Sequence, residues 1–94
     1  MTKSPKKTST QIIEEFTQTP EFKEYYQLEK MRLYIATRLK QIREAKKLSQ
    51  TQIADLMGVK QSYVAGLESG KRHPTLNTLN KFCIAVGGKL EIIY

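Results

Sequence analysis

The chain has little of what most enzymes and secreted proteins depend on. Its 94 residues include one cysteine, Cys83, and one histidine, His73. One cysteine cannot form an internal disulfide framework, and this usage fits a reducing cytoplasm. One Cys and one His cannot hold zinc within a single chain. Because no Gly-rich phosphate loop and no nucleophile with a general base beside it is found either, we expect no enzyme and no cofactor.

Long apolar runs and targeting signals are also missing. No stretch approaches the roughly twenty apolar residues of a membrane span, and no signal-peptide pattern opens the chain. We therefore expect a soluble, cytoplasmic protein. A chain of this length forms one small domain, with a short tail at most.

Charge is abundant but uneven. Residues 1–30 carry five lysines and five glutamates, whereas residues 31–94 carry eleven Lys or Arg against four Asp or Glu. The whole net charge of +7 therefore lies in the second segment. Such a concentration of positive charge is typical of a protein that binds a polyanion.

Residues 50–70 predict two short helices joined by a tight turn. The apolar residues fall on two helical faces, Ile53, Ala54 and Met57 on the first and Val64 and Leu67 on the second. Gly58 can adopt the positive φ that a helix needs to end and reverse. This arrangement indicates a helix-turn-helix, whose second helix is available to the major groove of DNA.

The rest of the chain divides into segments of different composition. Four further helical segments are expected. The first covers residues 11–18, the second starts at Thr19-Pro20, the third ends at about Lys47, and the fourth runs from Thr75 to about Val86. Whether the helix that starts at Pro20 breaks near residue 30 or continues is open. We divide the chain into a disordered basic tail (1–10), a helical segment (11–30), the helix-turn-helix domain (31–88) and a C-terminal strand (89–94).

The C-terminal segment alternates in the manner of a β-strand, with Leu90, Ile92 and Tyr94 on one side. A lone strand leaves a row of backbone hydrogen-bonding groups unpaired. We therefore expect this strand to pair with its copy in a homodimer, or with the sheet of a partner.

From about Arg38 to Val86 the chain resembles the Cro/phage-repressor-like (XRE) family of helix-turn-helix proteins. The residues that carry the resemblance are Arg43, Leu48-Ser49-Gln50, Ile53-Ala54, Gly58-Val59, Val64, Leu67-Glu68-Ser69-Gly70 and Pro74. The flanks, Pro20-Glu21-Phe22 with Tyr25 and Leu28-Glu29, and the terminal Gly88-Lys-Leu-Glu-Ile-Ile, look like those of HigA-type antitoxins. The resemblance implies an all-α, five-helix lambda-repressor-like domain, to which the N-terminal helical segment and the paired C-terminal strand are additions.

The resemblance also implies roles for single residues. Gln50 is expected to bind a DNA phosphate, and Gln61 and Ser62 to face base edges, where a glutamine can recognise adenine. The full DNA-binding set is Gln50, Lys60, Gln61, Ser62, Tyr63, Gly66, Ser69, Lys71 and Arg72. Arg43 and Glu68 match a pair that forms a buried salt bridge in the family, although Arg43 can also be read as an exposed cation.

Two positions depart from the family pattern. Lys60 stands at the N-cap of the second helix, where Ser or Thr is usual, so that cap must be weaker. Gly66 lies in the middle of that helix on its DNA face, at a cost of about 1 kcal/mol relative to Ala.

An aromatic stripe precedes the helix-turn-helix. Its toxin-binding candidates are Phe16, Phe22, Tyr25, Tyr26 and Leu28. At helical spacing such residues form either part of a core or an interface. An interface would suit an antitoxin, because a ribonuclease must hold RNA and should be basic, and the stripe lies among glutamates.

Three functions are compatible with these features. The first is the antitoxin of a type II toxin–antitoxin pair, which neutralises a small basic ribonuclease toxin of the HigB/RelE kind and represses its own operon by binding double-stranded operator DNA. The second is a stand-alone XRE-type repressor without a toxin. The third is a protein-interaction module that no longer binds DNA, against which the basic second segment and the Gln50/Gln61 pair count.

Overall fold

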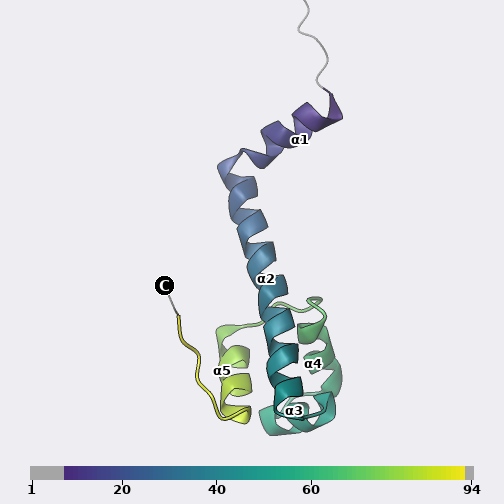
Figure 1. Cartoon of the computed structure of the whole chain (residues 1–94), viewed down its shortest axis with the longest axis vertical. Coiled ribbons are helices and arrows are strands. Elements are labelled where there is room, and N and C mark those ends of the chain that lie inside the picture. Colours follow the sequence, from purple (N-terminus) through teal and green to yellow (C-terminus); the bar gives the residue numbers. More distant parts are fainter. Residues whose placement is uncertain (1–7, 93–94) are drawn as a thin grey trace, which may run out of the picture. The chain divides into compact units, whose positions relative to one another are not determined.

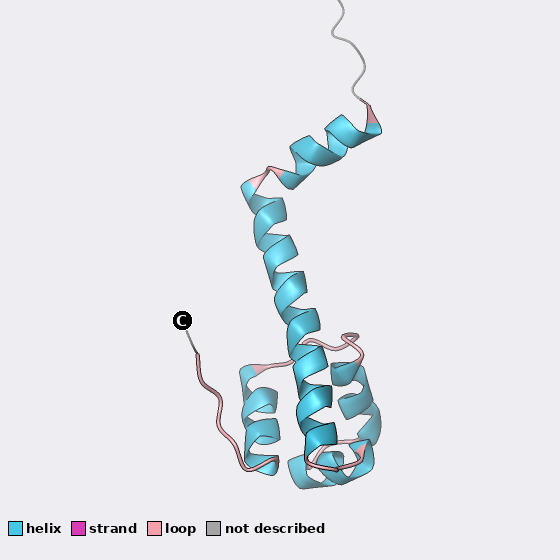
Figure 2. Cartoon of the chain, viewed as in Figure 1, coloured by secondary structure: helices cyan, strands magenta, loops and turns pink. Residues whose placement is uncertain are grey.

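A computed structural model describes residues 8–92, apart from the side chains of Ile12, Ile13 and Phe16, and every regular element in that range is an α-helix (Figures 1 and 2). The helices are α1 (Ser9–Thr17), α2 (Pro20–Ala45), α3 (Gln50–Met57), α4 (Gln61–Glu68) and α5 (Leu76–Ala85). None of the helices within residues 8–92 is both long enough and apolar enough to cross a membrane. The expected all-helical architecture is confirmed over the described range.

The chain forms two units, with the boundary between Lys30 and Met31. The sequence left open whether the helix starting at Pro20 ends near this boundary. It does not, because α2 continues through it as one helix of 26 residues.

Side-chain caps define the helices of the first unit. The Gln11 N–H donates to Thr8 Oγ1 (3.1 Å), and the Thr8 N–H donates to Gln11 Oε1 (2.9 Å). This reciprocal pair is a capping arrangement, and α1 begins at Ser9, two residues before the expected start. Thr19 Oγ1 accepts a hydrogen bond from the Phe22 N–H (3.2 Å) at the start of α2. Residues 1–7 of the predicted tail lie outside the described range.

The core of the second unit is built from four helices. Figure 1 shows α3, α4 and α5 gathered around the part of α2 that follows Lys30. The buried apolar side chains are Ala36 and Leu39 of α2, Ile53, Ala54 and Met57 of α3, Val64 and Leu67 of α4, and Phe82 of α5. Ile53 and Val64 are the largest fully buried side chains, and each burial of this kind contributes about 1.5–3 kcal/mol.

The turn between α3 and α4 sets the position of α4. Ser49 caps α3 in a capping box with Gln52, which fixes where the helix begins. Gly58 ends α3 with φ 72° in the left-handed region, and the Val59 N–H returns to the Ala54 carbonyl (3.0 Å). Lys60 is the N-cap of α4 and makes no side-chain capping bond, as expected for a lysine.

A second glycine turn directs the chain out of α4. Gly70 is buried at φ 78°, and a Cβ placed on it would lie 3.1 Å from Leu33 Cδ2. Both the backbone conformation and the close packing therefore require glycine. Residues 71–75 form a loop, and Thr75 then caps α5 by accepting from the Thr78 N–H.

The expected C-terminal strand is wrong for the part of it that the structure describes. Residues 89–92 form an irregular segment, in which Lys89 pairs with Glu91 (3.1 Å) and no strand is assigned. A strand is defined by its hydrogen-bonded neighbour, and residues 8–92 contain no second strand with which this segment could pair. Leu90 and Ile92 are 47% and 91% exposed, whereas Tyr94 lies outside the described residues.

Candidate nucleic-acid interface

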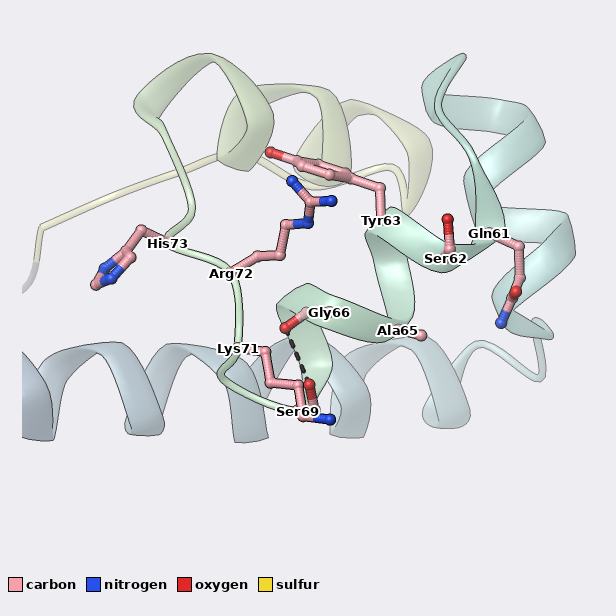
Figure 3. Close-up of a pocket in the computed structure, with 9 residues that line it drawn as sticks. All are labelled: Gln61, Ser62, Tyr63, Ala65, Gly66, Ser69, Lys71, Arg72 and His73. Carbon is pink, nitrogen blue, oxygen red and sulfur yellow. Dashed lines mark hydrogen bonds between the residues drawn. The ribbon is translucent and has the colours of Figure 1, made fainter.

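α4 buries one side in the core and leaves another beside a surface hollow. Val64 and Leu67 are buried, whereas Gln61, Ser62 and Ser69 are exposed. The hollow lies between α4 and the loop that follows it (Figure 3). It is lined by Gln61, Ser62, Tyr63, Ala65, Gly66, Ser69, Lys71, Arg72 and His73. Most of the expected DNA-binding residues are therefore brought to one surface.

A chain of hydrogen bonds connects the exposed start of α4 to the interior. Gln61 Nε2 donates to Gln50 Oε1 (2.7 Å), and Gln50 Nε2 donates to Glu68 Oε1 (3.2 Å). Glu68 in turn accepts from Arg43. The amide groups of the two glutamines are thus oriented by contacts that extend to a buried ion pair.

Arg43 and Glu68 form that ion pair between α2 and the last residue of α4. Arg43 Nε donates to Glu68 Oε2 (2.6 Å), Arg43 Nη2 to Glu68 Oε1 (3.0 Å), and Arg43 Nη1 to the Leu48 carbonyl (2.7 Å). The side chains are 11% and 3% exposed, so Arg43 is not the exposed cation of the alternative interpretation.

Hydrogen bonding to Glu68 raises the pKa of the Arg43 guanidinium, against the opposing effect of burial. Because both charges leave water, the pair fixes geometry more than it adds net stability.

Gln50 is engaged within the protein, although the resemblance assigned its amide to phosphate binding. Its Oε1 accepts from Gln61, and one of its two Nε2 hydrogens is donated to Glu68. A second Nε2 hydrogen remains, since a primary amide carries two. Gln50 is half-buried, its amide is oriented by these two hydrogen bonds, and one Nε2 hydrogen remains for a ligand.

Tyr63, which was expected among the DNA-binding residues, is engaged within the protein. It is half-buried, and its hydroxyl shares a hydrogen bond with Thr78 Oγ1 of α5 (3.0 Å). The guanidinium of Arg72 lies over its ring, 5.4 Å from the ring centroid. Tyr63 therefore links α4, α5 and the loop.

The other expected contacts divide into exposed and engaged side chains. Lys60, Lys71 and Arg72 are exposed. The Ser69 hydroxyl donates to the Gly66 carbonyl (3.1 Å) and so helps to end α4 (Figure 3).

Sequence reasoning did not single out Thr78, whose buried hydroxyl contacts both Tyr63 and Thr75 Oγ1 (2.9 Å). The sequence signal that could have identified Thr78 is its position three residues after Thr75, the N-cap of α5.

The aromatic stripe is largely exposed in the described residues. Tyr25, Tyr26 and Leu28 are 61%, 54% and 57% exposed. Phe22 is half-buried, and its ring stacks on Tyr26 with centroids 6.1 Å apart. The Phe16 side chain lies outside the described range. Tyr25, Tyr26 and Leu28 thus leave apolar surface on α2 that the described residues do not cover.

Comparisons with known proteins agree with this geometry. The protein-family model described as helix-turn-helix matches residues 39–93. Two proteins of Mycobacterium tuberculosis named as antitoxins are similar: HigA2 is 41% identical over 58 residues (61% of this chain, 57% of that protein), and HigA3 is 44% identical over 61 residues (63% and 56%). The immunity repressor protein of Bacillus phage phi105 is 34% identical over 59 residues (63% and 41%).

A solved structure shares the fold of this region. The restriction-modification controller protein C.AhdI from Aeromonas hydrophila superposes with a TM-score of 0.59 at 37% identity, covering 61% of this chain and 86% of that one. The chain spans about half the length of the curated relatives it matches. The family match covers more than half of this chain, and the chain belongs to the XRE-type helix-turn-helix family of DNA-binding proteins.

Proposed function

We propose that this protein is the antitoxin of a type II toxin–antitoxin pair, which represses its own operon as a DNA-bound homodimer and neutralises a small basic ribonuclease toxin of the HigB/RelE kind. The two similar M. tuberculosis proteins bear the names of antitoxins. The basic helix-turn-helix and the exposed apolar surface of α2 supply a separate surface for each activity.

The hydrogen bonds of Gln61 and Gln50 are the main support for sequence-specific DNA binding. Gln61 uses one Nε2 hydrogen on Gln50, which leaves one donor and the Oε1 acceptor. Adenine presents an acceptor and a donor in the major groove, so the remaining groups of Gln61 match it. The remaining hydrogen of Gln50 can donate to a phosphate. One oriented pair thus reads a base and anchors the backbone beside it.

The other DNA contacts follow from exposure and charge. Lys60 and Lys71 are exposed cations at opposite ends of α4 and would neutralise phosphates without selecting sequence. Ser62 starts the exposed row of α4 and would face base edges. The full proposed surface is Gln50, Lys60, Gln61, Ser62, Tyr63, Gly66, Ser69, Lys71 and Arg72, in which Tyr63 and Ser69 act by supporting their neighbours.

Toxin binding is assigned to the N-terminal helical segment. Tyr25, Tyr26 and Leu28 expose the kind of aromatic and aliphatic surface that anchors protein interfaces. The five glutamates of residues 1–30 would favour a basic partner, because complementary charge steers association. Phe16 and Phe22 complete the proposed surface.

The homodimer is assigned to the C-terminal segment, residues 89–94. Leu90 and Ile92 are exposed apolar residues beyond the last helix, and Tyr94 follows them in the sequence. A two-fold dimer would place two recognition helices on the half-sites of a palindromic operator.

The deciding experiment is capture from the native cell at high salt, with the full chain as bait. High salt removes nucleic acid and proteins that arrive with it, but it preserves an apolar interface. A stoichiometric small basic protein whose ribonuclease activity stops when the chain is added supports the antitoxin. The variant with Tyr25→Ser and Tyr26→Ser should lose that partner yet keep its DNA binding. Tyr63→Phe, which changes a tyrosine in the other unit, is the matched control and should keep the partner.

The second candidate is a stand-alone repressor, and the similarity to the phage phi105 immunity repressor favours it. In that case the parent chain and the Tyr25/Tyr26 variant are both recovered alone at high salt.

A further inference from the structure

Arg72 packs against α4, the second helix of the helix-turn-helix, at Gly66, the one residue of α4 that has no side chain. Its backbone N–H donates to the Gly66 carbonyl (3.1 Å). A Cβ built on Gly66 would lie 2.6 Å from Arg72 Cγ and 3.5 Å from Arg72 Cβ. The stem of Arg72 therefore fills the space in which a side chain of residue 66 would begin.

The guanidinium of Arg72 is held as well as its stem. It lies over the ring of Tyr63, 5.4 Å from the centroid (Figure 3). The Tyr63 ring is itself fixed, because its hydroxyl bonds to the buried Thr78. No carboxylate in the described part of the chain forms an ion pair with Arg72. The fork of donors is thus positioned by packing and a cation–π contact and is not neutralised.

The location of this arginine differs from that of an ordinary loop cation. Residues 62 and 66 form one row on α4, because side chains four apart lie on the same face. Arg72 continues this row at Gly66 and lines the same hollow as Ser62. Arg72 and Lys71 are both exposed, but the atoms nearest to the space beside Gly66 all belong to Arg72.

We propose that Arg72 is a specificity-determining residue that reads a guanine in the operator, supplying from the loop the base-reading side chain that α4 lacks at Gly66. A planar guanidinium can donate two hydrogen bonds to the O6 and N7 of guanine, the commonest specific contact in the major groove. This role rests on the proposed sequence-specific DNA binding. It gives a specific role to Arg72, which the family resemblance placed in the DNA-binding set.

The test is selection of binding sequences from a randomised DNA library by the full chain and by single variants. Arg72→Lys keeps the charge but loses the fork. It should lose about tenfold or more of the preference for guanine at one position of each half-site, with the salt dependence of binding unchanged. Lys71→Ala is the matched control, and it should weaken all sequences alike and reduce the salt slope by about one.

Gly66→Ala gives an independent test through the other partner. The added methyl group must displace Arg72 from Gly66, so the same guanine preference should fall. Circular dichroism of Gly66→Ala, compared with the parent chain, separates such a loss from unfolding. The double variant with Arg72→Lys should lose no more than either single one, because both act on the same contact.

Three outcomes would overturn the role of Arg72. If Arg72→Lys keeps the full preference and Arg72→Ala merely copies Lys71→Ala, Arg72 contacts phosphate only. If Gly66→Ala leaves the preference intact, the packing against Gly66 does not position Arg72. If the parent chain enriches no sequence at all, the proposed DNA function fails together with this role; a failure of Arg72 alone leaves the adenine preference of Gln61 in place.

Discussion

Removal of the Glu68 carboxylate should destabilise the protein more than any surface change. The side chain is 3% exposed and accepts three hydrogen bonds, two from Arg43 and one from Gln50. In Glu68→Ala the buried guanidinium keeps only the exposed carboxylate of Glu44, 3.9 Å away, as a counter-charge, and the loss of Glu68 costs about 3–5 kcal/mol. The free energy of unfolding of a small domain is about 5–15 kcal/mol, so this loss is a large part of it. Urea unfolding followed by circular dichroism measures the loss of unfolding free energy. In thermal unfolding, Tm should fall by more than about 10 °C.

Two matched variants show whether burial is the cause. The pair of Lys89 and Glu91 is exposed, with side chains 81% and 57% accessible, so Glu91→Ala should cost about 0–1 kcal/mol. Replacing Arg43 and Glu68 together by Met and Leu should cost far less than Glu68→Ala, since no charge is left buried. A loss below about 1 kcal/mol in Glu68→Ala, equal to that of Glu91→Ala, would refute the reasoning.

Three further changes test the DNA surface and the assembly. Gln61→Ala should relax the adenine preference at a cost of about 1–3 kcal/mol, measured by competition between operator variants; an unchanged preference would exclude base reading. Lys60→Ala with Lys71→Ala should lower the slope of log K against log salt by about 2 in titrations at several salt concentrations. An unchanged slope would exclude phosphate contacts there. Deletion of residues 89–94 should convert the proposed dimer to a monomer in sedimentation experiments, and a truncated chain that stays dimeric would place the dimer contact elsewhere.

The pH dependence of stability follows from the direction of the Arg43 shift. The pKa of this guanidinium is raised in the folded protein, chiefly by its hydrogen bond to Glu68. A raised pKa contributes stability that is complete below the unfolded value and is lost only as the pH rises through the folded value. The contribution of Arg43 should therefore be constant through neutral pH.

The elements that were predictable from sequence are those fixed by local chemistry. Ser49 and Gln52 indicate where α3 starts, and Gly58 indicates where it ends, because capping and positive φ depend on residues a few positions apart. The apolar spacing of Ile53, Met57 and Val64 then identifies the core. The partnership of Arg43 with Glu68 spans 25 residues, and only the family resemblance suggested it.

The features that sequence did not predict depend on the path of the chain in space. Alternation in residues 89–94 satisfies the local requirement for a strand, but a strand also needs a partner strand, and the described part of the chain contains none. The contact of Arg72 with Gly66 depends on the route of the loop after Gly70. The sequence identified Gly66 as a helix-weakening residue on the DNA face, but it did not indicate which side chain lies beside it.

The contact with Arg72 gives the cost of Gly66 a physical reason. Glycine in a helix interior costs about 1 kcal/mol relative to alanine, and alanine at this position would meet Arg72 Cγ. Arg72 is ordered by its backbone bond to Gly66 and by the Tyr63 ring, which limits the entropy that a long side chain loses on binding DNA. The low helix propensity of Gly66 is thus accompanied by the space that Arg72 occupies beside it. In Gly66→Ala the gain in helix propensity of about 1 kcal/mol is therefore opposed by the cost of moving Arg72, and the proposed sequence discrimination should weaken.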